Sequence, residues 1–198
     1  MSTATPGRPR LSPGRPGVEP RQEIIDAAAS LFAERGYAAT STRQIAERAG
    51  MRQASIYYHF AGKEEILLEL LQASIAPTLD RASEYLSEPD PRVALDRLVR
   101  ADVRTLLSEP YNIGTMYLSA EVQGDAFALF RAARVELIGI YGALAKRINP
   151  DIDVQFAGAC CIQLVDLVIR FRRDGEIHEN LPERIAQACL GVVGAASA

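Results

Sequence analysis

The sequence predicts an all-α protein, in which a three-helix head of the helix-turn-helix type precedes a larger helical body and the helices number roughly nine. Apolar residues recur at intervals of three and four from residue 22 onward, which is the spacing of one helix face. Glycine and proline interrupt this spacing and mark the helix ends. No convincing alternation of polar and apolar residues predicts a strand. We therefore divide the chain into an arm (1–20), a helix-turn-helix domain (21–67) and a body (68–198).

The composition is that of a folded domain. Hydrophobic residues make up 48% and charged residues 24% of the 198 residues, which excludes wholesale disorder. No uninterrupted apolar run approaches the roughly 18 residues of a membrane span, and residues 1–20 lack the apolar core of an export signal. The three cysteines form neither a disulfide framework nor a spaced zinc site. We expect a cytoplasmic protein without membrane contact, metal or cofactor.

The net charge of -3 conceals an asymmetry along the chain. Residues 1–63 carry nine basic and five acidic residues, a charge of +4, so the remainder carries -7. A basic head suggests that this end of the chain meets a polyanion, although charges scatter unevenly in any sequence.

The arm is rich in proline and glycine and contains Gly-Arg-Pro twice, around Arg8 and Arg15. This tripeptide resembles the core of the AT-hook. Proline keeps the chain extended, and arginine suits the negative potential of a narrow A·T-rich minor groove. Two interpretations stay open: Arg8 and Arg15 contact the minor groove, or the arm is a mobile, solubilising tail.

Three short helices are predicted for the head, at residues 22–36, 41–50 and 53–60. The second begins with a capping box, because Ser41 is followed three residues later by Gln44. In the third, Ile56 and Phe60 are four residues apart and face inward together. Two helices joined by a turn at Gly50 form a helix-turn-helix arrangement.

The face of the third helix opposite Ile56 and Phe60 contains no acidic residue. It offers Gln53, Ser55, Tyr57, Tyr58 and His59, flanked by Arg43, Arg52 and Lys63. Each of these side chains can hydrogen-bond a phosphate or a base edge. Because an α-helix fits the major groove, this face indicates DNA binding.

The run from Ile24 to just beyond Leu67 resembles the DNA-binding head of TetR-type transcriptional regulators. The matching positions are Ala28, Leu31, Phe32, Gly36, Tyr37, Thr40, Ile45, Ala46, Ala49, Gly50, Ser55, Ile56, Tyr57, Phe60, Lys63, Glu64 and Leu67. The resemblance implies an all-helical homodimer whose head binds operator DNA and whose body binds an inducer. Two positions depart from it: Arg52 stands where a small hydroxyl cap is usual, and Ala54 where glycine or proline is frequent.

Carried over position by position, the resemblance assigns DNA-binding roles. Gln53, Ala54 and Ser55 would face bases, with Gln53 pairing with adenine and Ala54 touching a thymine methyl. Arg43 would reach the groove edge or a phosphate, and Arg52 would add a phosphate contact. Phosphates would also be held by Thr40, Ser41, Tyr57, His59 and Lys63. Packing is the alternative for Tyr57 and Tyr58, and a link between helices is the alternative for His59.

The sequence predicts further helices for the body. The predicted segments are 64–87 with a kink or break at Pro77, 92–108, 111–122, 125–148, 154–173 and 180–194. Gly175 is the expected stop between the last two.

The last two segments, residues 154–194, are the candidate homodimer interface. Their apolar faces consist of Ala157, Cys160, Cys161, Leu164, Val165, Leu167, Val168, Phe171, Ile185, Ala188, Cys189, Val192 and Val193. These faces are too wide for one neighbour, and small residues at 157–159 would let helices approach closely. A four-helix seam across a two-fold axis accounts for the excess. The alternative is that both faces pack inside the chain.

Helical bodies hold ligands between helices, in mostly apolar cavities with few polar anchors. The bulky candidates for lining such a cavity are Tyr111, Met116, Tyr117, Phe127, Phe130, Tyr141 and Phe171, with core packing as the alternative for each. Asp166 and Arg170 are four residues apart within an apolar run. They pair with each other, pair across the dimer axis, or anchor a polar group of the ligand.

An enzyme is not predicted. The chain has two histidines, no Cys-x-x-Cys, no phosphate-binding glycine loop and no Gly-x-Ser-x-Gly. A redox switch at Cys160 and Cys161 is disfavoured because a disulfide between adjacent helix residues is strained. We expect a homodimeric repressor that a small-molecule effector releases from a palindromic operator. The alternative is a ligand-independent or architectural DNA-binding protein.

Overall fold

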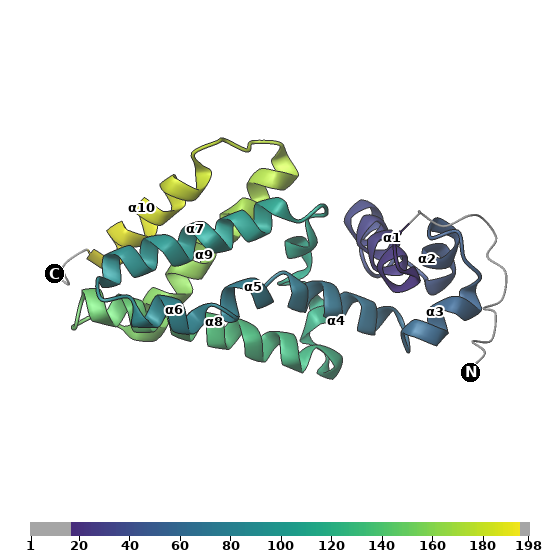
Figure 1. The fold of residues 1–198 in the computed structure, drawn as a ribbon, viewed down its shortest axis with the longest axis horizontal. Helices are drawn as coiled ribbons and strands as arrows, with labels where there is room; N and C mark the ends of the chain where they lie inside the picture. The colour runs from purple at the N-terminus through teal and green to yellow at the C-terminus, as the bar shows by residue number, and fades with distance from the viewer. Residues whose placement is uncertain (1–16, 195–198) are drawn as a thin grey trace. The chain divides into compact units, whose positions relative to one another are not determined.

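The computed structural model describes residues 17–194, and tight turns join the first three helices of this part. The chain forms two compact units, Met1–Leu70 and Leu71–Ala198, which we call the head and the body. The described residues contain ten α-helices, three 3-10 turns and no strand (Figure 1). The predicted all-α class is confirmed, with one more α-helix than the nine or so expected.

The head is built from α1 (Pro20–Arg35), α2 (Thr42–Arg48), α3 (Gln53–His59) and the first turns of α4 (Lys63–Ala73). α1 ends at Gly36, whose φ of 80° favours glycine. The capping box expected at the start of α2 is present: Gln44 and Ser41 bond each other's backbone amides. Ile24, Phe32, Ile45, Ile56 and Phe60 are buried and form much of the core of the head.

The long helical segment expected at 64–87 is divided into α4, α5 (Ala76–Leu79) and α6 (Ala82–Ser87). α4 ends at Ala73, four residues before Pro77, the residue at which the break was expected. Proline has no backbone N–H, so it is tolerated in the first turn of a new helix, where that donor has no partner. The hydroxyl of Ser74, just beyond the end of α4, donates to the carbonyl of Leu71 at 2.7 Å.

Four longer helices form most of the body: α7 (Pro91–Ser108), α8 (Ala128–Ile148), α9 (Val154–Asp174) and α10 (Leu181–Gly194). α10 packs along α7, and α9 packs along α8 (Figure 1). α9 ends at Gly175, which has the left-handed conformation that its expected role as a stop requires.

Two glycines set the crossing of α8 and α9. A Cβ atom on Gly158 would lie 2.3 Å from the carbonyl oxygen of Ile138, and one on Gly142 would lie 2.4 Å from that of Val154. Ala157, beside Gly158, is also buried. The small residues expected to bring helices together across a dimer seam therefore serve a close contact within the chain.

The helix predicted at 111–122 is wrong. The chain forms the 3-10 turns η1 (Ile113–Met116), η2 (Ala120–Gln123) and η3 (Asp125–Phe127) before α8 begins. Contacts with α9 determine this path: the side-chain amide of Asn112 donates to the carbonyl of Ile169 at 2.7 Å. A Cβ on Gly114 would lie 2.5 Å from the Ile169 side chain. Such long-range contacts leave no periodic signal in the local sequence.

Candidate DNA-binding face and effector pocket

The turn between α2 and α3 holds the two helices of the helix-turn-helix together. Gly50 has a φ of 66°, and the backbone N–H of Met51 donates to the carbonyl of Ala46 at 2.8 Å. Met51 is buried. The side chain of Arg52, at the position that precedes α3, makes no capping hydrogen bond. It is exposed instead, directly before α3.

The outer face of α3 is exposed as expected. Arg52, Gln53, Ala54, Tyr57 and Tyr58 are all exposed. The exposed fraction is 55% for Tyr57 and 86% for Tyr58. Ser55 and His59 are half-buried, and the His59 ring contacts the Tyr58 ring edge-on at a centroid distance of 5.0 Å. Two large aromatic side chains in water on a short helix are available to an external partner.

Thr42, the first residue of α2, was not singled out in the sequence. Its hydroxyl lies 3.2 Å from the Tyr57 hydroxyl and accepts a hydrogen bond of 3.1 Å from the side-chain amide of Gln53. Thr42 thus bridges α2 to both ends of the exposed face of α3 and orients Gln53 and Tyr57. Its place one residue after the Ser41 cap was the one local signal for it.

Two of the expected DNA contacts are engaged inside the head. Thr40 is 2% exposed, and its hydroxyl donates to the carbonyl of Gly36 at 2.8 Å, so the expected phosphate contact of Thr40 is corrected to a structural role. The Lys63 ammonium donates to the carbonyls of Tyr37 and Thr40, both at 2.9 Å. It also lies 4.1 Å from the centre of the Tyr37 ring. Lys63 therefore stabilises the loop that joins α1 to α2.

The remaining residues of the head that were expected to contact DNA differ in how free their side chains are. Ser41 is exposed but uses its hydroxyl in the capping box. Arg43 is exposed, and its guanidinium pairs with Glu47 at 2.9 Å on the same helix. Arg8 and Arg15, with the proposed minor-groove contact, lie outside the described residues.

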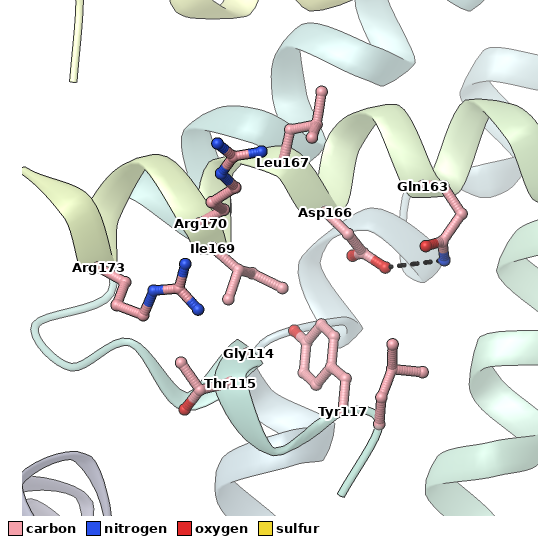
Figure 2. A pocket seen from close by; sticks show the side chains of 10 residues that line it. Gly114, Thr115, Tyr117, Gln163, Asp166, Leu167, Ile169, Arg170 and Arg173 are labelled. Carbon is pink, nitrogen blue, oxygen red and sulfur yellow. Dashed lines mark hydrogen bonds between the residues drawn. The ribbon is translucent and has the colours of Figure 1, made fainter. Parts of the chain in front are cut away.

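The body contains a pocket of about 310 Å³ between the η1 segment and α9 (Figure 2). α9 contributes Gln163, Asp166, Leu167, Ile169, Arg170 and Arg173. The η1 segment contributes Gly114, Thr115, Tyr117 and Leu118. Three of the residues expected to bind a ligand, Tyr117, Asp166 and Arg170, line this pocket.

The other six candidates for ligand binding do not line it. Phe127, Phe130 and Tyr141 are buried in the core of the body. Tyr111, Met116 and Phe171 are half-buried elsewhere on the body. These six residues stay candidates from the sequence alone, because bulky apolar side chains serve both core packing and the lining of a pocket, and the sequence does not separate the two roles.

Asp166 and Arg170 do not pair with each other. The Asp166 carboxylate accepts two hydrogen bonds from the Arg134 guanidinium on α8, at 2.7 and 3.2 Å. Arg170 instead donates to Asp174 at 3.4 Å. The Arg134 guanidinium also lies 4.9 Å from the centre of the Tyr117 ring, and the Tyr117 hydroxyl lies 2.7 Å from the Ser74 hydroxyl. A continuous chain of contacts therefore leads from Asp166 at the pocket to Ser74, next to the end of α4.

Asp102, on α7, is a buried carboxyl that sequence reasoning missed. It is 3% exposed and accepts hydrogen bonds from Tyr141 at 2.9 Å and from Thr78 at 3.1 Å. Burial raises the pKa of Asp102 to about 6, and the two hydroxyl donors partly oppose this shift. Its spacing of four residues from both Leu98 and Leu106 places it on the apolar face of α7, and this spacing was the signal in the sequence that could have found it.

The apolar faces predicted for the homodimer interface at 154–194 divide into two sets. Ala157, Cys161, Val165, Val168, Ile185, Cys189 and Val193 are buried within the chain. Cys160, Leu164, Leu167, Phe171, Ala188 and Val192 stay half-buried or exposed. α9 is long and apolar enough to cross a membrane by length and composition alone; it packs against α8, α10 and α7, and a third of its most apolar stretch is buried within the chain. Its remaining apolar surface lacks a cover within the described part of the chain.

The head of this chain is similar to known proteins. Residues 24–70 match the family model described as "Bacterial regulatory proteins, tetR family". The HTH-type transcriptional repressor KstR2 of Rhodococcus jostii is 40% identical over 80 residues, which are 40% of this chain and 39% of that protein. The matched part thus spans about two fifths of the length of this curated relative.

Solved structures extend the comparison over the body. The crystal structure of AmtR from Mycobacterium smegmatis is 38% identical, with a TM-score of 0.84, and the match covers 94% of this chain and 92% of that one. AibR, solved in complex with isovaleryl coenzyme A and operator DNA, is 20% identical with a TM-score of 0.71, covering 87% and 97% of the two chains. At that identity, AibR shows only that the fold is shared.

Proposed function

This chain belongs to the TetR family of bacterial regulatory proteins, and we propose that it is a homodimeric transcriptional repressor, released from a palindromic operator in the cytoplasm by a small-molecule effector. Its relatives in the comparisons are transcriptional regulators, and KstR2 is named a repressor.

One observation carries the DNA-binding proposal: α3 presents an exposed face without any acidic residue. Gln53, Ala54 and Ser55 begin this helix and are proposed to face the base edges, where a glutamine amide pairs with adenine. Tyr57, Tyr58 and Arg52 are proposed to reach phosphates, together with Arg43, whose pairing with Glu47 is exposed and therefore weak. Phosphate contacts position the protein, and base contacts specify the sequence.

The homodimer is proposed to form through residues 154–194. The uncovered half of the apolar faces on α9 and α10, together with Phe156 at 69% exposure, supports this interface. A two-fold axis would place two heads on successive major grooves, about 34–36 Å apart, and would explain a palindromic operator.

The effector is proposed to act through the contacts that join the pocket to α4. Tyr117 lines the pocket and meets the hydroxyl of Ser74, while α4 itself runs from the head into the body. A ligand shifts the operator equilibrium only by its different affinity for the two conformations of the dimer. Equal affinity of an effector for the free and the operator-bound dimer would contradict this coupling.

Selection of genomic fragments by the purified protein tests the proposal. The wild type should enrich a palindrome at near-physiological salt, while the double variant Arg52→Ala, Tyr57→Ala should not. Arg104→Ala, a change to an exposed arginine of the body, is the matched control and should select the same fragments. A folded wild type that enriches no palindrome would contradict a sequence-specific regulator.

The alternative is a DNA-binding protein without an effector. The pocket argues against it, because a hollow of this size with convergent polar groups is typical of small-molecule sites. If the palindrome is enriched but no small molecule alters its release, this alternative replaces the repressor with an effector.

A further inference from the structure

We propose that the effector is an amphipathic anion, a small molecule with a carboxylate or phosphate group at one end and an apolar body. This inference rests on the proposed effector function and names the chemistry of its ligand. It concerns the pocket between the η1 segment and α9, whose lining is cationic at one end and apolar along its walls.

The cationic end consists of Arg170 and Arg173, one turn apart on α9. Both guanidinium groups share one acidic partner, Asp174: Arg170 donates to it at 3.4 Å, and Arg173 donates to it at 2.8 and 3.4 Å. A guanidinium has five N–H donors, so each keeps donors that these bonds do not use. Two arginines against one carboxylate leave a positive charge suited to bidentate binding of an oxyanion.

The acidic residue in the lining does not cancel this charge. Asp166 is held by the Arg134 guanidinium through two hydrogen bonds, and both side chains are largely buried, with 14% of Arg134 and 13% of Asp166 exposed. A cationic group of a ligand would meet a carboxylate whose charge Arg134 already balances and to which the Gln163 amide also donates, at 3.4 Å. The pocket therefore favours an anion over a cation.

The walls of the pocket are suited to an apolar body. Leu118 and Ile169 line it together with the ring of Tyr117, and Leu118 is 77% exposed. Leu167 also lines it and belongs to the uncovered face of α9 proposed for the homodimer, so the pocket adjoins that interface. Covering such side chains removes apolar surface from water and favours binding. Figure 2 shows Arg170 and Arg173 at one end of the α9 side, with Asp166 and Gln163 at the other. A ligand lying along α9 would place its charged group by the two arginines and its apolar part beside Tyr117.

Four probes of six carbons each test the proposal by calorimetric titration of the full-length protein: hexanoate, hexyl phosphate, hexanamide and hexylammonium. Hexanoate or hexyl phosphate should bind saturably and about tenfold more tightly than the neutral amide, because charge-assisted hydrogen bonds to arginine are the stronger kind. Hexylammonium should be the weakest. Which of the two anions binds more tightly distinguishes a carboxylate effector from a phosphate effector.

Two double variants locate the binding. Arg170→Gln, Arg173→Gln should lose the preference for the anion while keeping the weak affinity for hexanamide. Arg170→Lys, Arg173→Lys retains the charge and should keep most of the preference, which separates loss of charge from a disturbed fold. The control Arg92→Gln, Arg104→Gln removes two exposed charges from α7 and should bind like the wild type.

Operator binding of every variant without probe separates the two proposals. A wild type that selects a palindrome but binds neither anion at millimolar concentration, or binds hexanamide equally well, overturns the anionic effector alone. Retention of the anion preference by Arg170→Gln, Arg173→Gln also overturns it. Failure to select any palindrome instead contradicts the proposed function.

Discussion

In the head, polar side chains gather on the exposed surface of α2 and α3, whereas in the body a group of polar side chains is paired inside the helical core. Gln53, Thr42 and Tyr57 form a network that water can reach. Asp102 receives its hydrogen bonds from Thr78 and Tyr141 where all three side chains are buried. Surface groups remain available to a partner, while buried groups fix the relative positions of helices. Changes in the head should therefore act mainly on DNA binding, and changes inside the body mainly on stability.

The largest effect should come from the glycine crossing in the body. Gly158→Ala would place a methyl group against the carbonyl of Ile138 on the backbone of α8, which cannot move as a flexible side chain would. We expect a loss of about 3 kcal/mol in the free energy of unfolding, at the upper end of the effects of overpacking. Chemical denaturation measures it.

The matched control is Gly139→Ala, because a Cβ there meets nothing within 4 Å. Replacing a helical glycine with alanine at an open site should stabilise the protein by up to about 1 kcal/mol. Equal effects of the two changes would show that the crossing of α8 and α9 is not close packed.

The buried carboxyl of the body should make stability depend on pH. The pKa of Asp102 is raised from its ordinary value of 3.8 to about 6, so the folded state binds its proton more tightly than the unfolded state does. The free energy of unfolding should then fall as pH rises from about 4 to about 6, and this contribution should be constant above that range. A shift of this size corresponds to about 3 kcal/mol at most.

Asp102→Asn isolates that dependence, since the amide cannot titrate. The difference in unfolding free energy between the wild type and this variant should change over the same pH range, as measured by denaturation at a series of pH values. Parallel curves for the two proteins would contradict a raised pKa at Asp102. Asp166 and Arg134, which also act on Asp102, are common to both proteins and cancel in the difference.

Lys63 is an exception to the difference between head and body, because it lies in the head but donates to backbone carbonyls of the head itself. Lys63→Ala removes two charge-assisted hydrogen bonds to the carbonyls of Tyr37 and Thr40 and should destabilise the protein by about 2 kcal/mol. The operator affinity of the folded variant should keep the salt dependence of the wild type. Arg52→Ala should instead lower the salt slope by about one phosphate contact without affecting stability.

The smallest effect is expected at the cap of α2. Ser41→Ala removes the hydroxyl that accepts from the backbone of Gln44 and should cost about 1 kcal/mol of stability. Ser41→Asp keeps a capping acceptor and should recover most of this loss in thermal unfolding. A loss of operator affinity by both variants at unchanged stability would assign Ser41 to DNA contact instead.

The head was predictable because its signals are local. Ser41 and Gln44 are three residues apart, Gly36 directly follows the helix that it ends, and Ile56 and Phe60 are one helical turn apart. These spacings are visible without knowledge of the fold.

The body was predictable only in outline. Asp166 finds its partner Arg134 at a separation of 32 residues, while the sequence suggested its neighbour Arg170. Asn112 and Gly114 adapt the η1 segment to Ile169, more than fifty residues away, where periodicity suggested a helix. Pairing across this distance depends on how helices pack, and a single sequence does not record it. The same reason hid the hydrogen-bond partners of Asp102 and the residues that line the pocket beside η1.

Position-by-position base preference on the selected palindrome, measured for the wild type and for Gln53→Ala, is the most direct test of the proposed role of α3. Gln53→Ala should relax the preference at one base pair of each half-site, worth about 1–3 kcal/mol of discrimination, and leave the other positions unchanged. Gln123→Ala, an exposed glutamine of the body, should preserve the full preference. An unchanged preference at every position in Gln53→Ala would contradict the account that α3 reads the operator.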